Sequence, residues 1–333
     1  MSSAALAQEL AMESDEERDS PLSRSDSIDP KAELASVCRD GNYQRAHELL
    51  ALGVDPRLSR VGFFNWSPLH FACHQGEMSF VKLLTESYEC QPEAEDKEGR
   101  VALHLAAQNG HVKVARYLVK NRGCIVDYGD IGDLTPLHHA CGWLSECSED
   151  KALEMIKFLV NKCHSDPNLR DKEGKNGLLH ACEKGFLTIV RFFVDECQCD
   201  LSSIDYHGNT SLHFAVAFSD NLELVRYIHS QTNIDISSAN DRGNTILHSA
   251  YASNCSHKDD IIEFLYGELK LDPYSTNKQG KTPFEMSLMT EPEKLFELTS
   301  IQHGSQEHVR HDLPPLQDTE NAPNNSTKSC TIM

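Results

Sequence analysis

The chain has 333 residues, with 51 acidic and 31 basic side chains and a formal net charge of −20. This charge argues against a nucleic-acid-binding protein that works by neutralising phosphates, and against binding to an anionic membrane surface by charge alone. No run of about 18 apolar residues is present, so no transmembrane helix is expected, and the acidic first twenty residues are unlike a signal peptide.

The N-terminal segment, residues 1–29, is acidic and rich in Ser. It has few apolar side chains, so we expect it to remain disordered. Four of its serines are candidate phosphorylation sites, because acidic, proline or arginine neighbours of the kind that kinases select stand beside them. They are Ser14, Ser20, Ser25 and Ser27.

A motif of the form Thr-Pro-Leu-His-x-Ala recurs between residues 30 and 301. Successive copies begin 34, 34, 41, 34 and 35 residues apart, and a degenerate copy follows. The copies begin at Ser67, Val101, Thr135, Asn176, Thr210, Thr245 and Thr282. Together with an opening copy around residues 32–38, they predict a repeat domain of about eight units.

Each copy predicts the same local structure. The Thr is placed to cap a helix, the Pro suits the first helical turn, and the Leu and Ala three residues apart point inward. A second helix follows, with apolar residues at helical spacing as in residues 112–119. A turn with a Gly, such as Lys97-Glu98-Gly99, then leads to the next copy.

This pattern resembles the ankyrin repeat family over residues 30–301. The resemblance implies an all-α fold, a solenoid of about eight helix–loop–helix units with β-hairpin fingers projecting on one side. It also implies that a protein partner binds the concave face, which the fingers and the first helices form.

The units depart from the motif at two kinds of position. In the fifth copy Asn176 and Leu179 replace Thr and His, so we expect the hydrogen bond of the His ring to be missing there. Insertions lengthen the loop between the two helices at residues 143–150 and 253–258. Such loops are either tolerated drift or part of a binding edge, and the sequence leaves both open.

Four aromatic residues are candidate partner-binding residues, because aromatic side chains dominate protein-interface hot spots. They are Phe63, Phe64, Trp66 and Trp143. For the first three, packing on the neighbouring finger is an equal alternative. For Trp143, which stands in the longer insertion, the alternative is that it folds back over its own loop.

No catalytic, cofactor-binding or metal site is expected, and the chain is not expected to be an enzyme. Five of the seventeen His stand at the motif position and are expected to form structural hydrogen bonds. Cys197 and Cys199, and the pair Cys163-His164, lack a second ligand pair at zinc-finger spacing. The twelve Cys are scattered through periodic apolar segments, which favours a reducing, cytoplasmic environment.

Residues 302–333 are polar and are expected to form a flexible tail. The tail ends in Cys330-Thr331-Ile332-Met333, a C-a-a-X box whose Met indicates that the prenylation machinery farnesylates Cys330. One farnesyl group anchors weakly, and no basic cluster or second Cys stands nearby. We therefore expect a cytoplasmic protein that reversibly contacts the cytoplasmic face of a membrane through its lipid alone.

These features favour a non-enzymatic adaptor or scaffold that joins a protein partner to a membrane. One alternative is a soluble inhibitor of a Rel/NF-κB-like transcription factor, a class that it resembles in its acidic Ser-containing tail and its repeats. That class has a paired-serine degradation motif, which this sequence lacks. Another alternative is a targeting subunit of type 1 protein phosphatase, because Arg60-Val61-Gly62-Phe63 matches a docking pattern used there. In that family the docking pattern precedes the repeats.

Overall fold

Pairs of helices repeat along the chain. The computed structural model describes residues 29–142, 147–231 and 235–290, all within one unit, Met1–Thr290. The first helices of the pairs are α2 (Pro30–Arg39), α4 (Pro68–Gln75), α6 (Ala102–Gln108), α8 (Pro136–Ala140), α10 (Gly177–Lys184), α12 (Ser211–Phe218), α14 (Ile246–Tyr251) and α16 (Pro283–Thr290). The second helices are α3 (Tyr43–Ala51), α5 (Met78–Glu86), α7 (Val112–Arg122), α9 (Glu149–Cys163), α11 (Leu187–Arg191), α13 (Leu222–Ser230) and α15 (Lys258–Ile262).

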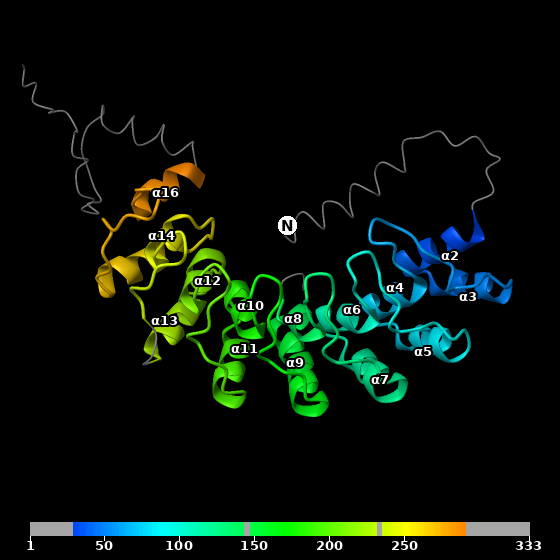
Figure 1. Ribbon diagram of the computed structural model, residues 1–333. Helices are drawn as coiled ribbons and strands as arrows, with labels where there is room; N and C mark the ends of the chain where they lie inside the picture. The colour runs from blue at the N-terminus through cyan, green and yellow to red at the C-terminus, as the bar shows by residue number, and fades with distance from the viewer. Residues whose placement is uncertain (1–28, 143–146, 232–234, 291–333) are drawn as a thin grey trace, which may run out of the picture. The chain divides into compact units, whose positions relative to one another are not determined.

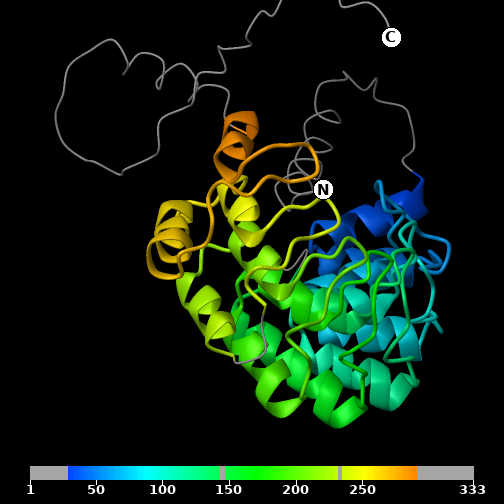
Figure 2. The same ribbon diagram turned by 60° about the vertical axis from the view of Figure 1, so that its left-hand side comes forward.

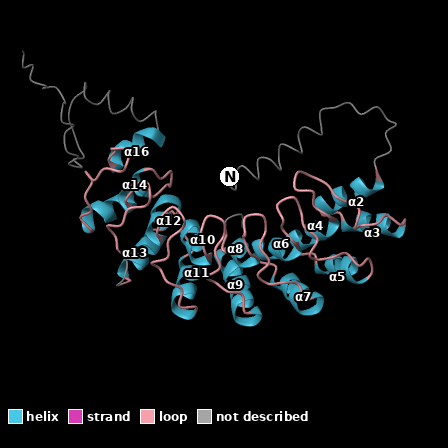
Figure 3. Ribbon diagram, viewed as in Figure 1, coloured by secondary structure: helices cyan, strands magenta, loops and turns pink. Residues whose placement is uncertain are grey.

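The pairs stand side by side in a row. First helices contact first helices of the next pair, as in α4 with α6 and α12 with α14, and second helices contact second helices, as in α7 with α9. Figure 1 shows the row curving from α2 in blue to α16 in orange. Figure 2 shows it from another side, and Figure 3 shows loops joining the helices. The expected all-α architecture is confirmed.

The first helices begin as the motif predicts. The Ser67 hydroxyl accepts the backbone N–H of His70 at the start of α4, and the Thr210 hydroxyl accepts that of His213 at the start of α12. In return, the ring nitrogen Nδ1 of each His accepts the backbone N–H of the capping residue. These reciprocal bonds satisfy N–H groups that a helix end otherwise leaves without a partner.

The same histidines join each unit to the next finger. Nε2 of the ring donates to a backbone carbonyl of the following unit at 3.0–3.3 Å. The pairs are His70 to Arg100, His104 to Leu134, His138 to Leu169, His213 to Asn244 and His248 to Lys281. Because Nδ1 accepts and Nε2 donates, the geometry requires the neutral imidazole.

The core is one cluster of apolar side chains that runs through successive units. The Leu and Ala of the motif, such as Leu103 and Ala106 in α6, are fully buried, and so are Ala115 and Leu118 in α7. Each helix pair packs against a neighbouring pair on both of its faces, so the burial of its apolar side chains depends on the stacking of the units. Within the described residues, no helix has the length and apolar character needed to cross a membrane.

The fingers are tight turns that precede the first helices. Five of the described fingers share the form Asp/Asn-x-x-Gly-x, and the finger that begins at Asp130 has Asp133, also with a positive φ, in place of the Gly. In these fingers the Oδ1 atom of the first residue accepts two backbone N–H groups. Oδ1 of Asp171, for example, accepts those of Glu173 and Lys175, both at 2.9 Å. The expected β-hairpins are not confirmed: in the described residues three fingers carry an isolated antiparallel bridge and none carries a strand.

Backbone hydrogen bonds join successive fingers at their tips. We call the residue that follows the first position of each turn the fingertip. Its N–H donates to a carbonyl of the preceding finger at 2.9–3.0 Å in every case. The bonds run from Lys97 to Phe64, Ile131 to Glu98, Lys172 to Gly132, Tyr206 to Glu173, Asp241 to His207 and Lys278 to Arg242. These six bonds form a ladder across the row.

Both insertions lie in loops between the helices of a pair. One separates α8 from α9, and residues 143–146 within it, Trp143 included, lie outside the described residues. The other separates α14 from α15. In the fifth unit the fully buried Leu179 stands where other units have the motif His. The hydrogen bond of the His ring is therefore missing there, as predicted.

The ladder predicts that the same Gly-to-Ala substitution lowers the folding stability by different amounts at two positions. Gly174 and Gly280 both have a positive φ, of 83° and 74°, so Ala strains the backbone at either site. At Gly174 the new Cβ also meets the Tyr206 backbone nitrogen at 2.7 Å, whereas nothing lies within 4 Å at Gly280. We expect Gly280→Ala to cost about 1 kcal/mol and Gly174→Ala clearly more.

Thermal melting and amide hydrogen exchange of both variants check this. Gly174→Ala should lower the melting temperature further and speed exchange at Tyr206. Equal melting temperatures would contradict the close approach of the two fingers.

Candidate functional site

The inner side of the row is formed by the fingers and the first helices. Its first finger holds three of the aromatic residues selected from the sequence. Phe63 is the fingertip, and 57% of its surface is exposed. Trp66 is half-buried; its Nε1–H donates to Oδ2 of Asp96 in the next finger at 2.8 Å. Trp66 thus packs on the neighbouring finger, which is the alternative use considered for it.

Arg100 completes this aromatic contact. Its guanidinium lies 4.5 Å from the Phe64 ring centre and 5.4 Å from that of Trp66, and it pairs with Asp96 at 2.8 Å. Both charges are almost fully buried. Phe64 and Trp66 therefore fix two fingers together, and Phe63 is the member of the three that faces solvent.

The segment Arg60–Phe63 does not have the extended shape of a docking peptide. Val61 and Trp66 exchange both backbone hydrogen bonds at 3.0 Å, and Val61 is half-buried. The Arg60 guanidinium donates to the Glu95 carbonyl of the next finger. An extended conformation requires these bonds to open.

Several selected residues lie outside the described residues. They are Ser14, Ser20, Ser25, Ser27, Trp143 and Cys330. Their chemistry stays a prediction from the sequence.

Two buried histidine–aspartate pairs lie in the middle of the inner side. His139 Nε2 lies 2.9 Å from Asp130 Oδ2, and His180 Nε2 lies 2.8 Å from Asp171 Oδ2. Each joins a first helix to the finger of its own unit. The sequence analysis missed both pairs. The sequence does carry a signal for them: in both units a His directly follows the position of the motif His, nine residues after the Asp that begins the finger.

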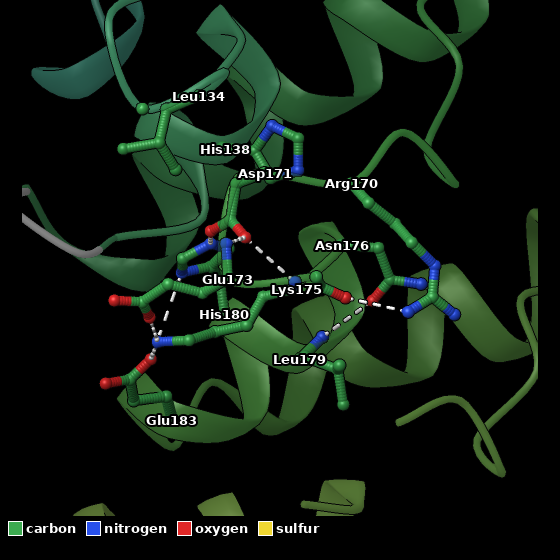
Figure 4. A network of polar contacts seen from close by, with 12 residues as sticks. Leu134, His138, Arg170, Asp171, Glu173, Lys175, Asn176, Leu179, His180 and Glu183 are labelled. Atoms are coloured by element: carbon green, nitrogen blue, oxygen red, sulfur yellow. Dashed lines mark hydrogen bonds and ion pairs between the residues drawn. The ribbon is translucent and has the colours of Figure 1, made fainter. Parts of the chain in front are cut away.

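A buried lysine lies beside the second pair (Figure 4). The Lys175 ammonium contacts carboxylate oxygens of Glu173 and Glu183, both at 3.0 Å, and lies 5.1 Å from the Phe214 ring centre. Burial alone would lower the pKa of Lys175, but the two carboxylates outweigh it and raise that pKa. The polar groups of this stretch are thus largely paired with one another.

The buried thiols and histidines have environments that disfavour charge. Burial raises the pKa of Cys38 to about 12 and that of Cys182 further, so both remain thiols at neutral pH. Burial lowers the pKa of His138 and of His74 to about 4. No three His, Cys, Asp or Glu side chains in the described ranges are grouped to hold a metal ion.

A groove opens between the last units. It has a volume of about 330 Å³ and lies between two fingers and the helices α12, α14 and α16. Its lining includes Phe214, Phe218, Arg242, Asn244 and Ser249. In contrast to the middle of the inner side, this groove combines exposed apolar surface with polar groups that face solvent.

The lowered histidine pKa values predict a loss of stability in mild acid. Between the folded pKa of about 4 and the ordinary value near 6.5, the unfolded chain binds more protons, so folding stability falls as pH falls. Each such His contributes at most about 1.4 kcal/mol per pH unit. We expect a lower melting temperature near pH 5.5 than near pH 7.

The variant His138→Gln should reduce this pH dependence, because Gln has no proton to take up. The matched control is His207→Gln, which changes an exposed histidine and should leave the pH dependence as it is in the unaltered chain. A melting temperature that is the same at both pH values would contradict the account.

Comparison with known proteins identifies the repeats. A family model of ankyrin repeats matches residues 34–130, 88–149 and 137–240, together more than half of the chain. Palmitoyltransferase AKR1 of Lachancea kluyveri is 29% identical over 176 residues, which are 51% of this chain and 22% of that protein. Probable 26S proteasome regulatory subunit p28 of Saccharomyces cerevisiae is 28% identical over 145 residues, 43% of this chain and 60% of that protein.

A third relative, Serine/threonine-protein kinase TNNI3K of Mus musculus, is 29% identical over 114 residues, 34% of this chain and 13% of that protein. The chain spans less than two thirds of the length of each of these three relatives, and their names describe different activities. What they share with it is the repeat region. A family match of this extent, on helix pairs joined by fingers, shows that the chain belongs to the ankyrin repeat family, whose repeats serve protein–protein interaction.

Proposed function

We propose that the chain is a non-enzymatic adaptor of about eight ankyrin units, whose inner side binds a protein partner and whose farnesylated Cys330 attaches the pair to a membrane. The observation that carries the binding part is the ladder between fingertips. It fixes the backbone and leaves the fingertip side chains free to differ. Those side chains are Phe63, Lys97, Ile131, Lys172, Tyr206, Asp241 and Lys278.

The fingertips form a mixed surface of the kind that protein interfaces use. Ile131 and Tyr206 expose 58% and 64% of their surfaces, although both are apolar or aromatic. Rigid exposed aromatic and aliphatic side chains supply contact area at a low cost in conformational entropy. Because the finger spacing is set by backbone bonds, a partner meets these side chains in fixed positions.

The membrane part of the proposal rests on the sequence Cys330-Thr331-Ile332-Met333. A single farnesyl chain supports only reversible membrane contact. The adaptor therefore stays at the membrane when the partner on its inner side adds a second contact. This arrangement makes membrane residence depend on partner binding.

Proximity labelling in cells tests the binding part. The variant Ile131→Asp with Tyr206→Asp places two charges on the fingertips and leaves the backbone ladder intact. We expect labelling of the main partner to fall at least about tenfold, because exposed apolar anchors dominate interface energy.

The matched control is Leu52→Asp with Ile125→Asp, which changes two similarly exposed apolar side chains at the ends of second helices. It should label as the unaltered chain does. Equal loss in both variants, or no loss in the fingertip variant, would argue that partners bind elsewhere.

Labelling with a prenyl analogue, followed by membrane fractionation, tests the lipid part. Cys330→Ser should incorporate no analogue and move the protein from the membrane fraction to the supernatant, because it removes the only thiol of the C-a-a-X box. Cys197→Ser, which changes a half-buried thiol of the repeat domain, should behave as the unaltered chain. Equal incorporation in all three proteins would remove this part of the proposal.

A further inference from the structure

The groove between the last units differs from the rest of the inner side in its charge. In the fingers that begin at Asp96, Asp130, Asp171 and Asp205, the closing acceptor is a carboxylate. In the next two fingers it is an amide, from Asn240 and Asn277. The exchange keeps the turn geometry and removes the negative charge. Among the described residues, no Asp or Glu lines the groove, although the chain as a whole carries −20.

The amides of this region are connected to one another. Asn240 Nδ2 donates to Asn209 Oδ1 at 2.7 Å, and Asn277 Nδ2 donates to Asn244 Oδ1 at 2.8 Å. The Asn244 side chain thus has its oxygen occupied, while its Nδ2 group has no partner among the described residues. This leaves a donor at the edge of the groove.

Arg242 supplies a cation at the same place. Its side chain is exposed, lines the groove and forms no ion pair with any residue in the described ranges. The Ser249 hydroxyl, also in the lining, likewise has no side-chain partner within them. By contrast, Lys175 in the middle of the inner side is held by two carboxylates. Unpaired donors therefore collect in this groove.

An apolar wall faces these donors. Phe214 and Phe218 lie on one side of α12 with ring centres 6.3 Å apart and planes at 26°. Phe218 leaves 60% of its surface exposed, whereas Phe214 is buried and has Lys175 on its ring. Met286 in α16 and Ala252 beside α14 complete the apolar part of the lining.

We propose that this groove binds an extended acidic segment of the partner protein, with an aliphatic or aromatic side chain against Phe218 and an adjacent carboxylate on Arg242 and Asn244. This deepens the proposed function by naming the chemistry that the inner side recognises, and it rests on that function. A carboxylate satisfies a guanidinium and an amide donor at once, and burial beside an aromatic wall strengthens both bonds.

Peptide display on the full chain tests the inference. A library of random dodecamers is selected on the immobilised protein, and the enriched peptides are titrated by fluorescence polarisation. We expect the enriched sequences to carry an Asp or Glu next to a large apolar residue. Their affinity should fall about tenfold or more in Arg242→Glu, because a carboxylate then meets a like charge, and by a similar factor in Phe218→Ser.

The matched control is Lys113→Glu, which makes the same reversal of charge at an exposed position of α7, a second helix. It should leave peptide affinity unchanged, and melting curves of all variants should coincide because the three side chains are exposed. Enriched peptides that are neutral or basic, an unchanged affinity in Arg242→Glu, or no enrichment at all would each overturn the inference.

Failure of this inference can be separated from failure of the proposed function. Partner labelling could depend on Ile131 and Tyr206 and yet be unchanged in Arg242→Glu and Phe218→Ser. That result would support the adaptor function and reject the binding of an acidic segment in the groove. Alternatively, peptide binding could be lost in Arg242→Glu although the chain labels no partner in cells. That result would reject the adaptor function and support the specificity of the groove for acidic peptides.

Discussion

The backbone hydrogen bond between neighbouring fingertips is the constraint on which the rest of the structure depends. Each fingertip amide donates to the preceding finger at 2.9–3.0 Å, so the turns are held at one spacing. Each of these turns is closed by its own Asp or Asn, whose Oδ1 atom accepts hydrogen bonds from two backbone N–H groups, as Asp171 does. The approach is so close that Gly174 has no room for a Cβ beside Tyr206. The bonds of the ladder join backbone atoms, so the identity of the tip side chains can vary, and the Lys172 ammonium adds a bond of its own to the Ile131 carbonyl.

Features with partners close in sequence, or recurring at the unit spacing, could be predicted from the sequence. The capping Thr and the motif His are of this kind, since Thr210 and His213 bond to each other. The histidine–aspartate pairs left a weaker signal, a His nine residues beyond the first residue of two fingers, and His180 meets Asp171 only when the finger folds back over its own helix. The burial of Lys175 depends on Phe214 from the next unit, and a lysine in a polar turn ordinarily indicates exposure.

One scaffold thus carries two electrostatic environments. From Asp130 to Glu183 the buried charges of the inner side pair with one another, so the contacts proposed there for a partner are those of exposed apolar side chains such as Ile131. Toward the end of the row, Asn240 takes the place of Asp in the turn, and Arg242 has no counter-ion among the residues that the structure describes. The amide of Asn240 closes the turn as a carboxylate does elsewhere, but it adds no negative charge to the groove.

The fifth unit shows which part of the design can be replaced. Leu179 removes the ring that elsewhere joins a first helix to the next finger, and His180 bonds to the finger of its own unit, as His139 does in the unit before. Arg170 crosses to the next unit by donating to the Gly174 and Ile204 carbonyls, a crossing that Arg60 also makes where the motif His is kept. A guanidinium has several N–H groups and can donate to two carbonyls, whereas the neutral imidazole has a single N–H to donate. The fingertip bond, from Tyr206 to Glu173, is kept here as in every other unit, so the bond between fingertips is more basic to the stack than the motif histidine.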